Sequence, residues 1–138
     1  MPRYNLDASV VIAWLFEQNI PAVDEFFAGL TAADDLSSAA LLYPECISNI
    51  REAVFLREVN TLTASGMIET LLGLEIEVVS STELSARAYE LATRFQHKKA
   101  YDAHYLAAAE LQDAELITRD RGLSHAAEAI GVPSRYLA

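Results

Sequence analysis

Short runs of apolar residues along the chain alternate with segments in which apolar residues recur every three or four positions. The short runs are typical of strands, and the longer period indicates helices that bury one face. This pattern predicts strands at 3–6, 35–38, 75–79, 115–118 and 134–137. It predicts helices at 9–16, 21–30, 44–58, 61–72, 82–95, 100–111 and 123–130.

The order of these elements predicts the fold class. Strands that alternate with helices favour an α/β fold with a mainly parallel sheet, because a helix is the usual connection between parallel strands. No internal repeat or Pro/Gly/Ser-rich linker interrupts the pattern, and 138 residues are enough to bury one core. We therefore expect a single domain over residues 1–138.

The charge balance limits the partners that such a domain can bind. Twenty acidic residues against ten Lys plus Arg give a net charge of −10. Phosphate backbones are repelled by such a surface, whereas a basic protein partner is attracted to it. Any nucleic-acid chemistry must therefore use metal cations and a local basic patch.

The cellular compartment follows from cysteine and hydropathy. The single cysteine, Cys46, cannot form an internal disulfide and fits a reducing environment. The apolar runs are too short to cross a bilayer, and the N-terminus lacks the pattern of a secretory signal. We expect a cytoplasmic protein with no membrane association.

Four acidic residues stand where the predicted topology brings chain segments together. Asp7 directly follows the first strand, and Asp120 follows the fourth with one residue between. Glu45 and Asp102 lie in the first turns of the third and sixth predicted helices. Crossover helices begin at the carboxyl edge of a parallel sheet, where open α/β folds build their sites. We therefore expect four carboxylates at one edge.

Such a cluster has a chemical consequence, because neighbouring carboxylates raise each other's pKa. Two unit charges about 4 Å apart repel by about 4 kcal/mol at an effective dielectric near 20. A cation relieves this repulsion, and oxygen ligands suit Mg²⁺ or Mn²⁺ rather than zinc. Such an ion lowers the pKa of bound water and stabilises the charge on a phosphodiester. A second interpretation stays open, in which the acids only cap helices or interact with helix dipoles.

Four segments around these acids resemble the motifs of PIN-domain proteins and, within that family, of VapC-type toxins from toxin–antitoxin systems. They are 6–11 (LDASVV), 42–45 (LYPE), 100–107 (AYDAHYLA) and 116–121 (LITRDR). The resemblance implies a PIN-like three-layer fold with a mainly parallel sheet of about five strands flanked by helices. It also implies a homodimer with Mg²⁺- or Mn²⁺-dependent endoribonuclease activity on RNA, inhibited by a cognate antitoxin.

The resemblance also implies roles for individual residues. The positions that match the acidic catalytic and metal-binding residues of the family are Asp7, Glu45, Asp102 and Asp120. Ser9 and Thr118 match small polar positions that orient those acids. Many members have Asp-Thr-Asn where this chain has Asp-Ala-Ser at 7–9, and no acid directly follows Asp120. Because of these departures, the sequence does not decide whether a second metal ion binds. It also does not decide whether Asp102 or Glu45 is the general base.

Basic residues near the acids form a candidate RNA-binding rim, which consists of Arg94, Lys98, Lys99, Arg119 and Arg121. Ordinary solvated surface charge is the other interpretation of this rim. The sequence also allows a different function, a catalytically silent acidic module that captures a basic protein. A signalling receiver domain is disfavoured, because Asp7 has no acidic neighbour and no Lys ends a late strand.

Overall fold

The computed structural model describes residues 2–138, in which five strands form one parallel sheet with seven helices around it. The strands are β1 (Arg3–Leu6), β2 (Asp35–Ala39), β3 (Glu77–Val79), β4 (Glu115–Thr118) and β5 (Ser134–Tyr136). The helices are α1 (Ala8–Leu15), α2 (Pro21–Ala28), α3 (Leu42–Phe55), α4 (Thr61–Leu72), α5 (Thr82–Arg94), α6 (Tyr101–Leu111) and α7 (Arg121–Ala129). The predicted α/β class is confirmed.

The strands lie in the order β3-β2-β1-β4-β5, and each neighbouring pair is parallel. The central strand β1 pairs with β2 on one side and with β4 on the other. Leu6, Leu116 and Ile117 on these strands are fully buried, because helices cover both faces of the sheet. The carboxyl ends of β1 and β4 therefore lie side by side.

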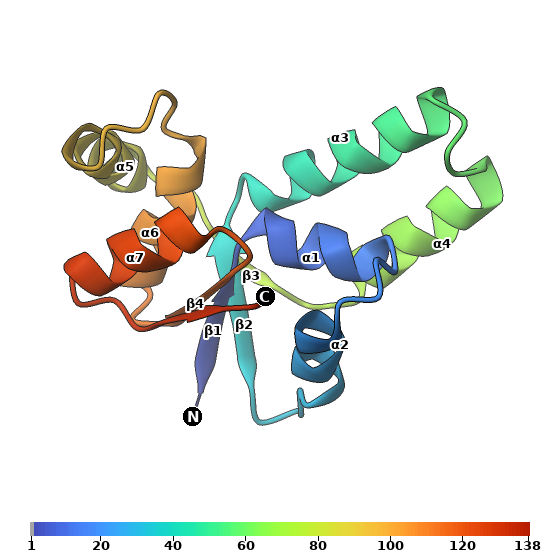
Figure 1. The fold of residues 1–138 in the computed structure, drawn as a ribbon, viewed down its shortest axis with the longest axis horizontal. Coiled ribbons are helices and arrows are strands. Elements are labelled where there is room, and N and C mark those ends of the chain that lie inside the picture. Colours follow the sequence, from blue (N-terminus) through green and yellow to red (C-terminus); the bar gives the residue numbers. More distant parts are fainter. Residues whose placement is uncertain (1) are drawn as a thin grey trace.

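Helices α1 to α4 lie to the right of the strands in Figure 1, and α5 to α7 lie to the left. Helix α6 packs against β1, β2 and β4, and α5 packs against α6. Alanines dominate the buried surface of α6, which lets it approach both the sheet and α5 closely. Its position brings the first turn of α6 to the carboxyl edge of the sheet.

Helix α3 differs from the predicted range of 44–58. It begins at Leu42, so that Pro44 is its third residue. Proline is tolerated there because the first four N–H groups of a helix have no partner within it. The helix ends at Phe55, since Arg57 adopts left-handed backbone with a φ of 61°.

Two further boundaries have local causes. Strand β3 begins at Glu77 rather than at 75, because Glu75 has a φ of 53° that extended backbone does not allow. Helix α7 begins at Arg121 rather than at 123, because the Asp120 side chain caps it. The other predicted boundaries agree closely. None of the helices in residues 2–138 is long and apolar enough to span a membrane.

Candidate metal centre

Asp7 lies directly after β1, is only 5% exposed, and is held by three donors. Its Oδ2 accepts hydrogen bonds from Thr118 Oγ1 at 2.6 Å and from Ser9 Oγ at 2.9 Å. Its Oδ1 accepts a long bond of 3.4 Å from the backbone N–H of Ser9, which caps α1. One edge of the carboxylate is thus fixed by hydroxyls, while Oδ1 keeps capacity for another partner.

The two hydroxyls also connect Asp7 to the loop that follows β4. The backbone N–H of Arg119 donates to Ser9 Oγ at 3.1 Å, and that of Asp120 donates to Thr118 Oγ1 at 2.9 Å. Both hydroxyls contact Asp7, as residues that orient it must do. Their effect on activity stays a prediction.

The other three acids lie at the starts of three helices near the same edge of the sheet. Glu45 lies half-buried in the first turn of α3, and Asp102 lies exposed in the first turn of α6. Asp120 is exposed and caps α7, where its Oδ1 accepts a bond of 3.0 Å from the N–H of Leu123. The structure therefore brings the four acids to the carboxyl edge of the sheet, and two of them also cap helices.

The pKa values of three of the acids, Asp7, Glu45 and Asp102, are raised. Burial raises the pKa of Asp7, and the charge of Asp102 adds to the rise, while the Thr118 and Ser9 hydroxyls oppose it. Burial is the largest cause that raises the pKa of Glu45, and the charges of Asp7 and Asp102 raise it further. For Asp102, burial of its carboxyl and the charge of Asp120 both raise the pKa. Each of the four carboxylates thus lies within electrostatic range of another.

The chemistry of this donor set fits a hard divalent cation. None of the four acids forms an ion pair with a Lys, Arg or His of residues 2–138. Within the same residues, no three His, Cys, Asp or Glu side chains stand close enough together to enclose a metal directly. Mg²⁺ commonly keeps several waters and uses only one or two carboxylates, so it does not require a closed protein cage. The predicted Mg²⁺ or Mn²⁺ itself stays a prediction.

The predicted basic rim divides into two groups. Arg119 donates from Nε to the carbonyl of Leu137 at 3.3 Å, and Arg121 lies 4.7 Å above the ring of Tyr136. Arg94 lies 5.3 Å from the ring of Phe95. These contacts give the three arginines structural roles beside any role in RNA binding.

Lys98 and Lys99 form the second group of the rim. Both are exposed in the segment between α5 and α6, directly before the helix that carries Asp102. Neither forms an ion pair within the part of the chain that the structure describes. These two lysines are therefore available to a phosphate.

Two residues near the acids were not assigned to the site from the sequence. His97 lowers the pKa of Asp102, so the imidazole lies close enough to act on that carboxylate. Tyr105 is fully buried and lies within electrostatic range of Asp7 and Glu45. The spacing of Tyr105, three residues after Asp102 on a helix, is the signal in the sequence that places it on the same face.

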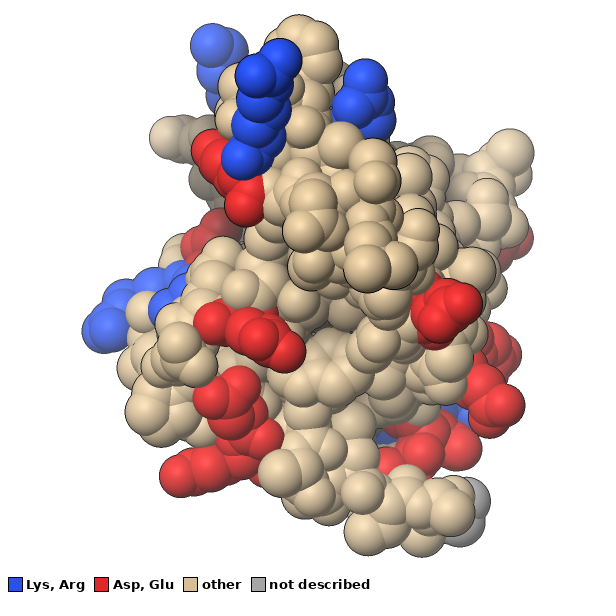
Figure 2. Space-filling model, turned by 90° about the vertical axis from the view of Figure 1, so that its right-hand side faces the viewer, with Lys and Arg blue, Asp and Glu red and all other residues tan. Residues whose placement is uncertain are grey.

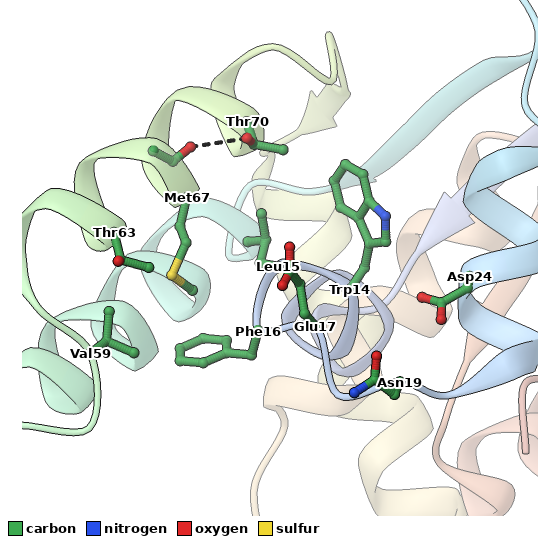
Figure 3. Close-up of a pocket in the computed structure, with 11 residues that line it drawn as sticks. Trp14, Leu15, Phe16, Glu17, Asn19, Asp24, Val59, Thr63, Met67 and Thr70 are labelled. Carbon is green, nitrogen blue, oxygen red and sulfur yellow. Dashed lines mark hydrogen bonds between the residues drawn. The ribbon is translucent and has the colours of Figure 1, made fainter.

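A separate cavity of about 600 Å³ lies between α1 and α4, away from the four acids. Figure 3 shows Trp14 and Phe16 at the end of α1 opposite Met67 of α4 and Val59 of the turn before it, with Asp24 of α2 on the Trp14 side. No member of the acidic cluster lines it. This cavity has a mixed lining of apolar and polar side chains that includes the acidic residues Glu17 and Asp24.

Comparison with known proteins places the chain in a family. The model of the PIN domain matches residues 4–129, so the chain belongs to the PIN-domain family. This confirms the resemblance seen in the sequence. A search of curated proteins found no significant match.

Solved structures give the same fold. The VapBC-1 structure from nontypeable Haemophilus influenzae has a chain with a TM-score of 0.70 and 16% identity, with 98% of each chain covered. The structure of VapBC2 from Rickettsia felis, bound to a DNA fragment from its promoter, has a chain with a TM-score of 0.72 and 12% identity, and 99% of each chain is covered. A toxin–antitoxin complex from Klebsiella pneumoniae has a chain with a TM-score of 0.67 and 16% identity, and 98% of each chain is covered.

Proposed function

We propose that this protein is a metal-dependent endoribonuclease and the toxin of a type II toxin–antitoxin pair. The observation that carries the proposal is the buried Asp7, fixed by two hydroxyls near three further carboxylates that form no ion pair within residues 2–138. Membership of the PIN-domain family supports nuclease activity. The toxin role is supported by structural similarity to VapBC and other toxin–antitoxin complexes.

The residues of the site divide the work. Asp7, Glu45, Asp102 and Asp120 would hold Mg²⁺ or Mn²⁺, which when bound lowers the pKa of water and neutralises phosphodiester charge. The hydroxyls of Thr118 and Ser9 fix the orientation of the Asp7 carboxylate. Asp102 and Asp120 are exposed, so RNA can reach this side of the cluster. Glu45 and Asp102, whose pKa values are raised, are the two candidates to accept a proton from attacking water.

The cognate antitoxin is the proposed protein partner. The net charge of −10 favours a basic partner, and acidic side chains are spread over the middle and lower part of the face in Figure 2. The cavity at Trp14, with Glu17 and Asp24 at its margin, combines apolar and acidic contacts on one surface. A basic segment with apolar side chains fits that combination. We also propose, from the family resemblance, that the protein forms homodimers in the cytoplasm.

The direct test is cleavage of single-stranded RNA by the purified protein. We expect cleavage with millimolar Mg²⁺ or Mn²⁺ and none after chelation, because four unneutralised carboxylates repel the phosphate backbone. Addition of metal in excess of the chelator should restore cleavage. Binding of a basic protein without RNA cleavage under any metal condition would favour the silent binding module instead.

The lysines before α6 provide a separable prediction about RNA affinity. Replacement of Lys98 and Lys99 by Gln should weaken RNA binding and make it less dependent on salt. The plot of log affinity against log salt has a negative slope, and its magnitude should fall by about 1 to 2, because each lost phosphate contact removes roughly 0.7 to 0.9. Affinity for Mn²⁺ should stay nearly unchanged. The measurement is RNA binding in Ca²⁺ at several salt concentrations.

A matched control removes the same charge at a distance. Arg51 lies in the second half of α3 and Arg57 lies just after its end, whereas Glu45 is in its first turn. Their double replacement by Gln changes the net charge equally. This variant should keep the salt slope of the wild type. An equal loss in both variants would return Lys98 and Lys99 to the role of ordinary surface charge.

A further inference from the structure

Tyr105 is a buried residue of α6 that lies near two of the four acids, Glu45 and Asp7. It lies on α6 three residues after Asp102, and residues with that spacing share one face of a helix. Helical side chains lean toward the N-terminus of their helix, so the Tyr105 ring points back toward the first turn of α6. That turn lies at the carboxyl edge of the sheet, the edge that carries the four acids. The ring is fully buried.

The hydroxyl of Tyr105 is buried and has no hydrogen-bond partner of standard geometry in the described residues. Buried hydroxyls rarely lack a partner, so this one requires an explanation. Burial and the negative charges of Glu45 and Asp7 raise its pKa. A tyrosine hydroxyl is in any case protonated at neutral pH and has a hydrogen to donate.

Three possible acceptors lie near that hydroxyl, and among them the Glu45 carboxylate is the one that interacts with it as a hydrogen-bond partner. The Cys46 sulfur is a weak acceptor. Asp7 already accepts three hydrogen bonds, from the Thr118 and Ser9 hydroxyls and from the Ser9 N–H. Within residues 2–138, no other side chain donates to the Glu45 carboxylate, and the Tyr105 hydroxyl lowers the pKa of Glu45 against the effect of burial.

We propose that Tyr105 is a positioning residue whose hydroxyl donates to the Glu45 carboxylate and holds it toward Asp7 and Asp102. This inference rests on the proposed metal site, because the position of Glu45 matters only if its carboxylate is a ligand or a base. Without this bond, the half-buried Glu45 side chain has several rotamers that point to solvent. Tyr105 thus has a function beyond filling the core.

The test is the affinity of the full-length protein for Mn²⁺ alone, measured by calorimetric titration without RNA. Tyr105→Phe keeps the ring and removes only the hydroxyl, and we expect Mn²⁺ binding to weaken about 10-fold, the usual effect of losing a bond that orients a ligand. In a Glu45→Ala background the same replacement should change affinity less than about 2-fold, since its partner is already absent. Tyr4→Phe, on β1 away from the acids, is the control and should have no effect.

The outcomes separate the inference from the proposed function. An equal loss with and without Glu45 would show that Tyr105 acts through packing, and unchanged Mn²⁺ affinity would show that its hydroxyl is idle. Either result overturns the inference while metal-dependent RNA cleavage by the wild type stands. A wild type that neither binds Mn²⁺ nor cleaves RNA overturns the proposed function, and the inference with it.

A second measurement applies even if Tyr105→Phe fails to fold. In the wild-type protein, proton NMR should show the Tyr105 hydroxyl hydrogen in slow exchange, with a nuclear Overhauser contact to the side chain of Glu45. A contact to Cys46 or to the backbone in place of Glu45 would contradict the proposed bond.

Discussion

Replacement of Asp7 by Asn should lower RNA cleavage by more than about 100-fold, because a ligand carboxylate contributes more than the bonds that orient it. The fold should persist, since Asn matches the shape of Asp and still caps α1. Asp102→Asn should have a similar effect at an exposed position, where folding is even less sensitive. The measurement is the rate of cleavage of one RNA at saturating Mn²⁺, with circular dichroism to verify the fold.

Asp113 provides the matched control for these variants. It is exposed after α6 and has a φ of 51°, a backbone conformation that Asn adopts as readily as Asp. Asp113→Asn changes the net charge equally and should cleave RNA like the wild type. Undiminished cleavage by both Asp7→Asn and Asp102→Asn would remove the acids from the catalytic site.

The same variants test the toxin role in the native host. Expression of the wild type alone should arrest growth, and expression of Asp7→Asn at the same level should not. Co-expression of the cognate antitoxin should restore growth. Normal growth and intact bulk RNA at high wild-type expression would contradict the toxin role.

Most of the fold could be predicted from local patterns. Asp7 and Asp120 follow apolar strands directly, and a parallel sheet brings strand ends to one edge whatever the packing of the helices. The boundaries that differed depend on single backbone angles, such as those of Arg57 and Glu75. Non-glycine residues with positive φ carry a weak signal in the sequence, so these ends could not be predicted.

The site was harder to predict, because side-chain contacts depend on packing between distant segments. The contact of Thr118 with Asp7 joins residues 111 positions apart, and only the pairing of β1 with β4 creates it. The structural roles of Arg119 and Arg121 depend on the C-terminal residues Leu137 and Tyr136, which fold back against α7. Charge alone had suggested an RNA contact for both arginines.

The second large effect concerns stability without metal, which should increase as the pH falls from neutral. Asp7, Glu45 and Asp102 have raised pKa values, so the folded protein binds more protons than the unfolded chain at mildly acidic pH. Stability then rises as the pH falls through the folded pKa values, and the gain is complete below the unfolded ones. Glu110 acts in the opposite direction, because its bonds to Arg87 lower its pKa. Its contribution is lost as the pH falls below its ordinary pKa of 4.5, so the gain should appear above that value.

Asp7→Asn removes one charge from the cluster and should flatten this pH dependence. In chelator at neutral pH, the variant should match or exceed the wild-type free energy of unfolding, by about 1 kcal/mol. Asp113→Asn should keep the wild-type pH dependence, since Asp113 lies outside the cluster. A variant as pH-dependent as the wild type would show that Asp7 does not contribute to the effect.

Metal should make the wild type more stable than Asp7→Asn, the reverse of the order expected in chelator. Mg²⁺ or Mn²⁺ binds the folded site and not the unfolded chain, so at 100 times its Kd it should add about 2.7 kcal/mol to wild-type stability. Asp7→Asn should gain much less, and the wild-type gain should shrink at acidic pH, where protons compete for the carboxylates. If the acids served only as helix caps, metal would change neither protein, and Asn would cap as well as Asp. Thermal melting of both proteins in chelator and in metal, at matched ionic strength, distinguishes the two roles, and a wild-type midpoint unmoved by millimolar metal would count against the metal centre.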